Sequence, residues 1–365
     1  MSSFKNLPIP GFYNGKTAGQ WSYRANHMQL LTDAVDWRKK HGIKAAATDK
    51  TKIALLLIDL QKDFCLPPVL DSSGRWIGGG ALYVGGRSGT GAIDDMRRTA
   101  EFIYRNLHVI TSIRPTMDTH FAFQIFFTSF WLKEDGHHPD SFTLVTVDDI
   151  KKGKYQPNPA VAGFLCSGNV GWLRQQCIHY AEELEKAGKY ALYLWPPHCM
   201  LGDEGHALVG TFQEARMFHA YVRSAQAESE IKGGHPLTEN YSVLGPEVLT
   251  RHDGVSLTQK NARFVQALLD YDYIIVGGQA ASHCFAWTVN DLHTEILIKA
   301  PEMAKKVYLL TDCTSAVTVP DGKGGFYADF TPEVEKAMKS WEEKGMNLVK
   351  STDPIESWPG INLNV

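Results

Sequence analysis

Two residues of the sequence could act together as a nucleophile and a proton acceptor. Cys284 ends the segment Gly277–Cys284, whose small residues allow the backbone to turn sharply and to approach a substrate closely. Apolar residues at helical spacing after it predict a helix that begins near Cys284, where a thiol has a lowered pKa and backbone N–H groups can hold an oxyanion. Asp59 directly follows the apolar run Ile53–Ile58, where partial desolvation raises a carboxyl pKa and suits it to proton transfer.

Both residues also have an ordinary structural interpretation. Asp59 could cap a helix or a turn. A cysteine beside glycines is more often a small core residue than a nucleophile. His283 is a tempting general base beside Cys284, but the side chains of adjacent residues usually point apart, so we keep it outside the predicted catalytic set.

A third group of residues has the composition of a metal site. Asp118 and His120 lie two residues apart, so in an extended segment their side chains can face the same way. His198 follows another candidate strand. One aspartate and two histidines suit a divalent metal ion and leave positions open for water or substrate. Because an Asp-x-His pair is common, polar surface residues are the alternative interpretation.

The elements that must position these residues indicate an α/β fold. Continuously apolar runs predict buried parallel strands at Ile53–Ile58, Tyr273–Val276 and Val307–Leu310. Weaker strand candidates are His108–Ile113, Gln124–Thr128 and Ala191–Leu194, and helical spacing marks Gln29–Lys40, Asp94–Asn106, Gly171–Ala187, Leu257–Leu269 and Pro332–Lys344. Strands that alternate with helices predict a three-layer α/β/α domain with a mostly parallel central sheet. Ligands bind at the carboxyl ends of such strands, where Asp59 lies.

Length and charge narrow the class of protein. We predict one domain over residues 51–365 of the 365-residue chain, with an N-terminal extension at 1–50 and an insertion around 133–170. The formal net charge of −3 offers no basic field for nucleic acid or membrane. No apolar run approaches the roughly 18 residues that span a bilayer, and no signal peptide is visible, which predicts a cytoplasmic protein. The six cysteines include no CxxC pair and indicate no disulfide framework.

These segments together resemble the isochorismatase-like cysteine hydrolases, and within them the nicotinamidases. Six segments follow the order of the family motifs between about residues 53 and 315: Ile58–Phe64, Gly78–Leu82, Asp118–His120, Trp195–Cys199, Ile231–Gly233 with Asn240–Ser242, and Gly278–Cys284. Any one of these segments is a weak signal, whereas six in the family order are a strong one.

The match to the family pattern has departures. Ala281 and Ser282 stand where the nucleophile loop of the family usually carries Thr-Asp. Thr119 replaces a common aromatic residue between the two metal ligands, and Gln124 stands where a further histidine is common. The stretch from His120 to His198 is much longer than in compact members of the family. These differences leave the catalytic residues intact and bear on the substrate and on the coordination of the metal.

The resemblance implies a mechanism. Asp59 would take the proton of Cys284 as the thiol attacks a carboxamide, and Lys232 would keep both groups ionised. Ammonia would leave, and water would hydrolyse the thioester. The resemblance further implies a cis peptide bond before the cysteine.

The resemblance also implies a binding site. Asp118, His120 and His198 would bind one divalent ion, with zinc favoured over manganese or iron. Phe64 and Trp195 would form an aromatic slot, unless they are simply core residues, and the backbone N–H near Ala280 would help to hold the oxyanion. The substrate would be nicotinamide or a related aromatic carboxamide, with a place in NAD metabolism. A homo-oligomer would agree with the family, although no residue pattern supports one.

Three competing functions deserve comparison. The segment Val276-Gly277-Gly278 could indicate a dinucleotide-binding oxidoreductase, but no G-x-G-x-x-G with a later acidic residue follows a strand. A non-catalytic binding protein on the same fold would not need Asp59, Lys232 and Cys284 together. The serious rival is a hydrolase of the same family that acts on another small amide, maleamate-like or ureide-like.

Overall fold

A six-stranded parallel sheet forms the centre of the computed structural model, which describes residues 6–363. Its strands lie in the spatial order β14-β11-β10-β1-β4-β9. Their bounds are β1 (Ile53–Ile58), β4 (Ser112–Asp118), β9 (Glu230–Lys232), β10 (Tyr273–Gly278), β11 (Val307–Leu310) and β14 (Asn347–Val349). Counted along the chain, this order is 3-2-1-4-5-6, so the winding of the sheet reverses between β1 and β10. The prediction of an α/β fold with a parallel central sheet is confirmed.

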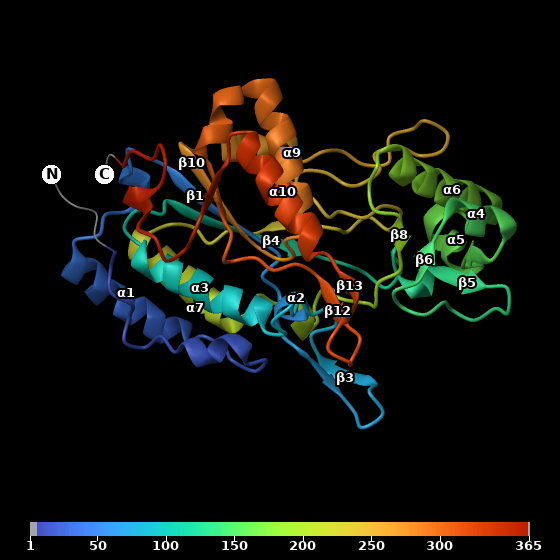
Figure 1. Ribbon diagram of the computed structural model, residues 1–365, viewed down its shortest axis with the longest axis horizontal. Coiled ribbons are helices and arrows are strands. Elements are labelled where there is room, and N and C mark those ends of the chain that lie inside the picture. Colours follow the sequence, from blue (N-terminus) through green and yellow to red (C-terminus); the bar gives the residue numbers. More distant parts are fainter. Residues whose placement is uncertain (1–5, 364–365) are drawn as a thin grey trace.

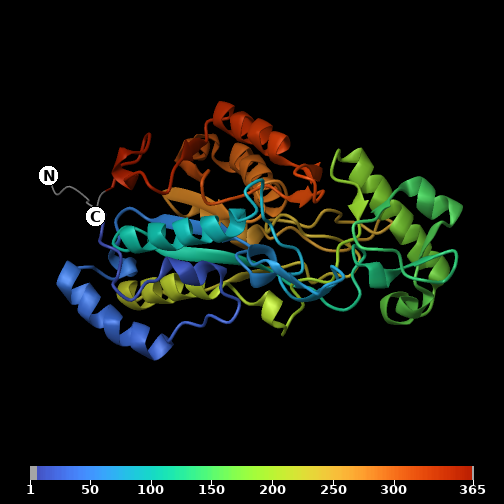
Figure 2. The ribbon, with the colours of Figure 1, turned by 60° about the horizontal axis from the view of Figure 1, so that its bottom comes forward.

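Helices cover both faces of the sheet (Figures 1 and 2). One face carries α3 (Gly91–Arg105) and α7 (Gly210–Arg223), with α1 (His27–His41) packed outside α7. The other face carries α8 (Ala262–Leu269), α9 (Cys284–Lys299) and α10 (Thr331–Glu343). No helix within residues 6–363 combines the length and the apolar character that a membrane crossing needs.

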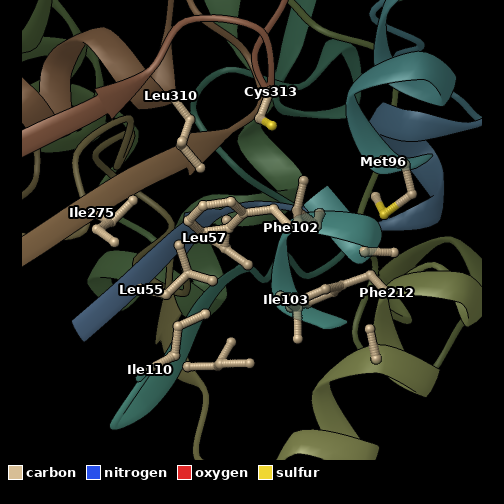
Figure 3. Close-up of a cluster of buried hydrophobic side chains, with 14 of the residues drawn as sticks. Leu55, Leu57, Met96, Phe102, Ile103, Ile110, Phe212, Ile275, Leu310 and Cys313 are labelled. Carbon is tan, nitrogen blue, oxygen red and sulfur yellow. The ribbon is translucent and has the colours of Figure 1, made fainter. Parts of the chain in front are cut away.

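Strand β1 is buried on both faces, which explains why its sequence is continuously apolar. Leu55 and Leu57 point into the core that α3 and α7 cover, whereas Ala54 and Leu56 point into the core beneath α8 and α9. Figure 3 shows the first of these cores, in which Leu57 of β1 and Phe102 of α3 lie side by side. The sheet is therefore held rigidly between two apolar layers.

A lobe (residues 125–195) projects from one end of the molecule (Figure 1). It contains α4 (Val147–Lys152), α5 (Pro159–Cys166) and α6 (Val170–Lys186), the pair β5 (Trp131–Lys133) and β7 (Tyr155–Pro157), and the pair β6 (Leu144–Val145) and β8 (Leu192–Tyr193). The lobe has its own apolar core, with Trp131 and Leu173 fully buried. It is thus more than a surface loop.

The remaining elements are short. Two hairpins stand outside the central sheet: β2 (Pro68–Leu70) with β3 (Trp76–Gly79), and β12 (Thr318–Pro320) with β13 (Phe326–Asp329). The short helices are α2 (Lys62–Cys65), η1 (Gly15–Gly19), η2 (Ala46–Thr48), η3 (Thr128–Phe130), η4 (Glu204–His206), η5 (Pro301–Lys306) and η6 (Ile355–Ser357). Both hairpins lie near the carboxyl ends of the central strands, where they line a common groove with the lobe.

The structure corrects the weaker strand predictions. The strand predicted at His108–Ile113 is misplaced, because residues 106–109 form a turn and the strand runs over Ser112–Asp118. Arg114, Pro115 and Thr116 interrupt the apolar run there and hide the strand in the sequence. Gln124–Thr128 is not a strand, although Phe127 forms an isolated bridge with Trp195. Ala191–Leu194 contains only the two residues of β8, which pair with β6 and not with the central sheet.

The helix predictions agree with the structure in position, with shifts at the ends. Helices α1, α3, α6 and α10 lie over the predicted ranges within a few residues. Helix α8 begins later than predicted, at Ala262, because the Asn261 side chain accepts a hydrogen bond from the N–H of Phe264 and caps the helix there. Helix α7 and strands β9 and β14 were not predicted, and β9 is too short and polar to show a strand pattern.

Candidate active site

The predicted site residues meet where the winding of the sheet reverses. Asp59 follows the last residue of β1, and Cys284 begins α9 just after the neighbouring β10. Asp118 ends β4 and Lys232 ends β9, where these two residues are register partners. In open α/β sheets the crevice at such a reversal is where ligands bind. The carboxyl ends of four strands therefore supply the charged groups of one site.

Glycine at position 278 allows the cysteine loop to approach β1. Gly278 has φ +110°, and a Cβ atom there would lie 2.2 Å from the carbonyl oxygen of Ile58. The loop continues through a cis peptide bond between Gln279 and Ala280. Asp95, buried on α3, accepts a hydrogen bond from the Gln279 side chain at 2.8 Å. The loop that carries Cys284 is therefore anchored to two other elements.

Lys232 is the centre of the charged cluster. Its Nζ lies 2.9 Å from Asp59 Oδ2, 3.0 Å from Asp118 Oδ1 and 3.6 Å from Cys284 Sγ. It also donates a hydrogen bond of 2.8 Å to the carbonyl oxygen of Asn240. The side chains of Asp59, Lys232 and Cys284 are all buried. One ammonium group thus contacts the predicted base, the predicted nucleophile and a predicted metal ligand.

Burial and neighbouring charges set the protonation of the cluster. Burial raises the pKa of Asp59, whereas Lys232 and the Thr116 hydroxyl, which donates to Asp59 Oδ1 at 2.5 Å, oppose that rise. Burial alone would lower the pKa of Lys232, but Asp118, Asp59 and Cys284 raise it well above its ordinary value. Lys232 therefore stays charged, while burial shifts Asp59 toward its protonated form.

The thiol of Cys284 differs from the expectation for a helix N-terminus. Burial raises its pKa well above the ordinary value, and the nearby carboxylates Asp59 and Asp118 add to the rise, although Lys232 opposes it. The resting thiol is therefore protonated. A group that removes its proton during attack is needed, and Asp59 is close enough to affect the thiol directly.

Asp118, His120 and His198 have the arrangement of a metal site. One ligand atom from each of the three side chains lies within 4.8 Å of the others, and all three residues are buried. Asp118 Oδ2 lies 2.8 Å from His120 Nε2 and 3.7 Å from His198 Nε2. His120 and Lys232, against the effect of burial, hold the pKa of Asp118 well below its ordinary value. The aspartate therefore presents an ionised oxygen to both imidazole rings.

The second nitrogen of each ring supports this interpretation. His198 Nδ1 lies 2.8 Å from the carbonyl oxygen of Pro196, and His120 Nδ1 lies 3.2 Å from that of Gly233. A carbonyl oxygen only accepts, so Nδ1 carries the proton and Nε2 carries a lone pair in the neutral ring. Metal-binding histidines are usually oriented in this way. The three donors therefore fit a divalent cation between them.

Gly233 and Gln124 lie beside the donor set, whereas the Thr119 side chain contacts a different residue. Gly233 has φ +91°, and a Cβ atom there would lie 2.6 Å from Asp118 Oδ1, so glycine lets the lysine strand approach the aspartate. Gln124 donates to the carbonyl oxygen of Gly233 at 2.8 Å, the same oxygen that orients His120. The Thr119 hydroxyl lies 2.9 Å from His206 Nε2, on the other side of the chain from the donors.

An inner pocket opens directly onto Cys284. Phe64, Trp195 and Ala280, the three predicted substrate-binding residues, line it together with His198 and Asp118. Asp59 and Lys232 lie behind this wall, in contact with one another. Phe64 packs edge-on against His198, with ring centroids 5.4 Å apart. The pocket therefore places two aromatic side chains, a metal-ligand histidine and the thiol around one space.

The sequence did not reveal several residues of this site. Glu239 and Tyr241 line the pocket, and Thr116 contacts Asp59 from β4. Tyr241 stands within the motif segment Asn240–Ser242 and Glu239 directly precedes it, so their place in or beside a motif was an available signal. Thr116 had none, because it lies inside an unpredicted strand. His283 also lines the pocket, but burial lowers its pKa to about 4, and its Nδ1 faces the Ser282 hydroxyl at 2.8 Å.

The fold and the site together define an α/β protein with a buried cysteine–lysine–aspartate cluster beside a three-residue metal-ligand set. No model of a protein family and no curated protein matches the chain. Among solved structures it is similar to a nicotinamidase/pyrazinamidase of Acinetobacter baumanii, at 16% identity and a TM-score of 0.45 over 83% of this chain and 98% of that one.

Two further solved structures match this chain to a similar extent. The yeast nicotinamidase bound to the inhibitor nicotinaldehyde has 15% identity and a TM-score of 0.45 over 82% of this chain and 99% of its own. The pyrazinamidase of Pyrococcus horikoshii in complex with zinc has 15% identity and a TM-score of 0.40 over the same shares.

Proposed function

We propose that this protein is a cysteine-dependent amidohydrolase that converts nicotinamide or a related aromatic carboxamide to the acid and ammonia. The observation that carries the proposal is the position of Lys232 Nζ, which contacts Asp59 at 2.9 Å and Cys284 at 3.6 Å behind the wall of a pocket. An ammonium group placed there stabilises the thiolate that forms during attack.

The proposed reaction has two halves. Asp59 takes the thiol proton as Cys284 Sγ bonds to the carboxamide carbon; the carbon–nitrogen bond then breaks, and Asp59 returns the proton to the departing ammonia. A water molecule, deprotonated by Asp59, next attacks the thioester, and the acid leaves as the thiol is restored. A pKa raised by burial suits Asp59 to a role in which it must both accept and donate a proton.

Backbone N–H groups supply the proposed oxyanion site. The N–H groups of Ala280 and Cys284 donate a hydrogen bond to no described residue, and both residues line the pocket. Cys284 is the first residue of α9, so its N–H is one of the unpaired donors of a helix N-terminus. Donors of this kind, held ready for the developing charge, are among the largest contributors to catalysis.

Asp118, His120 and His198 would hold one divalent ion, and zinc suits this donor set better than magnesium or calcium. The ion would act as a Lewis acid that anchors a substrate nitrogen or a water molecule. Phe64 and Trp195 would bound a flat ring whose carboxamide faces Cys284. The proposed partner is thus a small uncharged amide.

Ammonia release from nicotinamide, benzamide and maleamate tests the proposal. Benzamide has the same shape as nicotinamide but lacks the ring nitrogen, so it should react far more slowly if that atom binds the metal. The variant Cys166→Ala removes a half-buried thiol of the lobe and is the control for Cys284→Ala. Faster hydrolysis of maleamate than of nicotinamide would reject the aromatic substrate and favour the rival amide hydrolase.

A further inference from the structure

A second and much larger cavity continues outward from the inner pocket. The inner pocket has a volume of about 50 Å³, whereas the outer cavity, which we call the vestibule, has about 810 Å³. The two share a set of wall residues: Leu82, Tyr83, Trp195, Tyr241, His283 and Val317. A ligand group that extends out of the inner pocket therefore enters the vestibule.

Three segments far apart in the sequence build the outer walls of the vestibule. Leu70 comes from the β2–β3 hairpin, Leu144 and Tyr193 from the β6–β8 pair of the lobe, and Val319 and Tyr327 from the β12–β13 hairpin. These segments lie outside the six-stranded sheet. The vestibule thus belongs to the additions of this chain and not to the core fold that positions Cys284.

The walls of the vestibule are uncharged. Among the described residues that line it, there is no aspartate, glutamate, lysine or arginine. Two polar atoms of its aromatic side chains are already used within the protein: the Tyr190 hydroxyl donates to the carbonyl oxygen of Ser282 at 2.9 Å, and Trp195 Nε1 donates to the Tyr241 hydroxyl at 3.2 Å. Apart from a few tyrosine and threonine hydroxyls, the wall offers a ligand ring faces and aliphatic side chains.

The passage between the two cavities is aromatic as well. His283 lines both, and its ring centroid lies 4.9 Å from that of Tyr190 and 5.1 Å from that of Phe330. Burial lowers the pKa of His283 to about 4, so this ring is neutral at neutral pH. No charge therefore hinders an apolar group that passes from one cavity to the other.

Resting on the proposed amidohydrolase function, we infer that the natural substrate is an amide whose acyl part carries an uncharged, apolar extension, such as a second ring or a branched alkyl group, which occupies the vestibule. The vestibule is far larger than the inner pocket, so a nicotinamide-sized molecule held against Cys284 would leave most of the apolar vestibule wall uncovered. Large apolar cavities with few polar groups are typical of sites that bind such ligands. Burial of one ring or branched alkyl group strengthens binding roughly 10- to 100-fold.

The first test compares nicotinamide with 5-phenylnicotinamide by ammonia release, because position 5 is not adjacent to the ring nitrogen or to the carboxamide. The phenyl compound should have a kcat/KM about 10-fold or more above that of nicotinamide. A carboxyl group in the same position should lower kcat/KM, because no cation faces it. If the phenyl compound reacts no faster than nicotinamide, the inference is wrong.

Two substitutions on the vestibule wall sharpen this test. Leu144→Glu and Val319→Glu each place a charge in the groove from a side chain that is already partly exposed, so folding is not at risk. Each should remove most of the preference for the phenyl compound and change the kcat/KM of nicotinamide less than about twofold. Phe164→Glu, on the exposed face of α5 in the same lobe, is the matched control and should change neither. A preference that survives both vestibule variants would overturn the inference.

Binding to Cys284→Ala separates this inference from the proposed function. If the wild-type protein hydrolyses no amide, the proposed function fails. Titration calorimetry of the variant with 5-phenylnicotinamide and nicotinamide still measures whether the vestibule accepts the second ring. Tighter binding of the phenyl compound supports the inference, and equal binding contradicts it. Light scattering of Leu144→Glu covers one further outcome. If this variant has a lower oligomeric mass than the wild-type protein while the preference for the phenyl compound is unchanged, the groove is an interface between copies of the chain, and the inference is contradicted.

Discussion

The inner pocket and the vestibule meet at His283 but are built on different principles. Side chains at the ends of four parallel strands form the charged cluster, with Asp59, Lys232 and Cys284 buried and in mutual contact. Two hairpins and the lobe form the vestibule, whose walls are uncharged and partly exposed, as at Leu144. Chemistry requires a rigid support, whereas an added apolar groove can vary without disturbing it.

This contrast predicts that substitutions in the two regions have different kinetic effects. A change at the charged cluster should slow the hydrolysis of every amide by the same factor, because the reacting atoms are common to all. A change in the vestibule should instead alter the ratio between a large and a small amide, because only the large one reaches it. The variants below test the first half of this contrast, from the largest expected effect to the smallest.

Cys284→Ala should abolish turnover of every amide while the fold is retained. Removal of a covalent nucleophile lowers kcat by at least roughly 10⁴-fold. Ammonia release, with circular dichroism to confirm folding, measures the effect, and Cys166→Ala should retain nearly full activity. Retention of a tenth of the activity by Cys284→Ala would rule out a cysteine mechanism.

Asp59→Asn and Lys232→Met should each lower kcat nearly as much as Cys284→Ala. The three groups act as one unit, so the double variant should be scarcely worse than either single one. A kinetic double-mutant cycle measures this. Additive losses would show that Asp59 and Lys232 serve different sites, despite the contact of 2.9 Å between them.

His198→Ala should lower the metal content of the purified protein, as measured by elemental analysis, and should raise KM more than it lowers kcat. The reason is that His198 lies at the metal-ligand set and on the pocket wall, not between Asp59 and Cys284. His179→Ala, on α6 of the lobe, is the control and should retain the metal. An unchanged metal content in His198→Ala would reject the proposed ligand set.

Thr116→Val should have the smallest effect, a loss of about 10- to 100-fold, because a hydrogen bond to a charged group is removed. The Thr116 hydroxyl lowers the pKa of Asp59, so its removal raises that pKa. Asp59 would then become ionised only at higher pH, and the acidic limb of the kcat/KM profile should move upward. Thr119→Val, whose hydroxyl faces His206, should leave the limb in place.

The sequence predicted the long helices except α7 and the most apolar strands, but it did not locate the short or polar strands. The buried strands β1, β10 and β11 have the apolar runs that burial on both faces requires, so they are visible locally. Strand β4 was misplaced because Pro115 and Thr116 break its apolar pattern, although it is an interior strand of the sheet, between β1 and β9. Strand β9 has three residues and no periodicity, so only its pairing with β4 makes it a strand.

What the sequence indicated by itself is the candidate catalytic set, since Asp59, Lys232 and Cys284 stand in motifs whose order and spacing could be compared with a family. Their hydrogen-bond partners, such as Thr116, and the vestibule wall around Leu144 and Val319 were decided by the tertiary structure alone. The physical reason is the separation along the chain of the residues that form each feature. Helical and strand periodicity are properties of adjacent residues, whereas a cavity forms only when topology brings separate segments together.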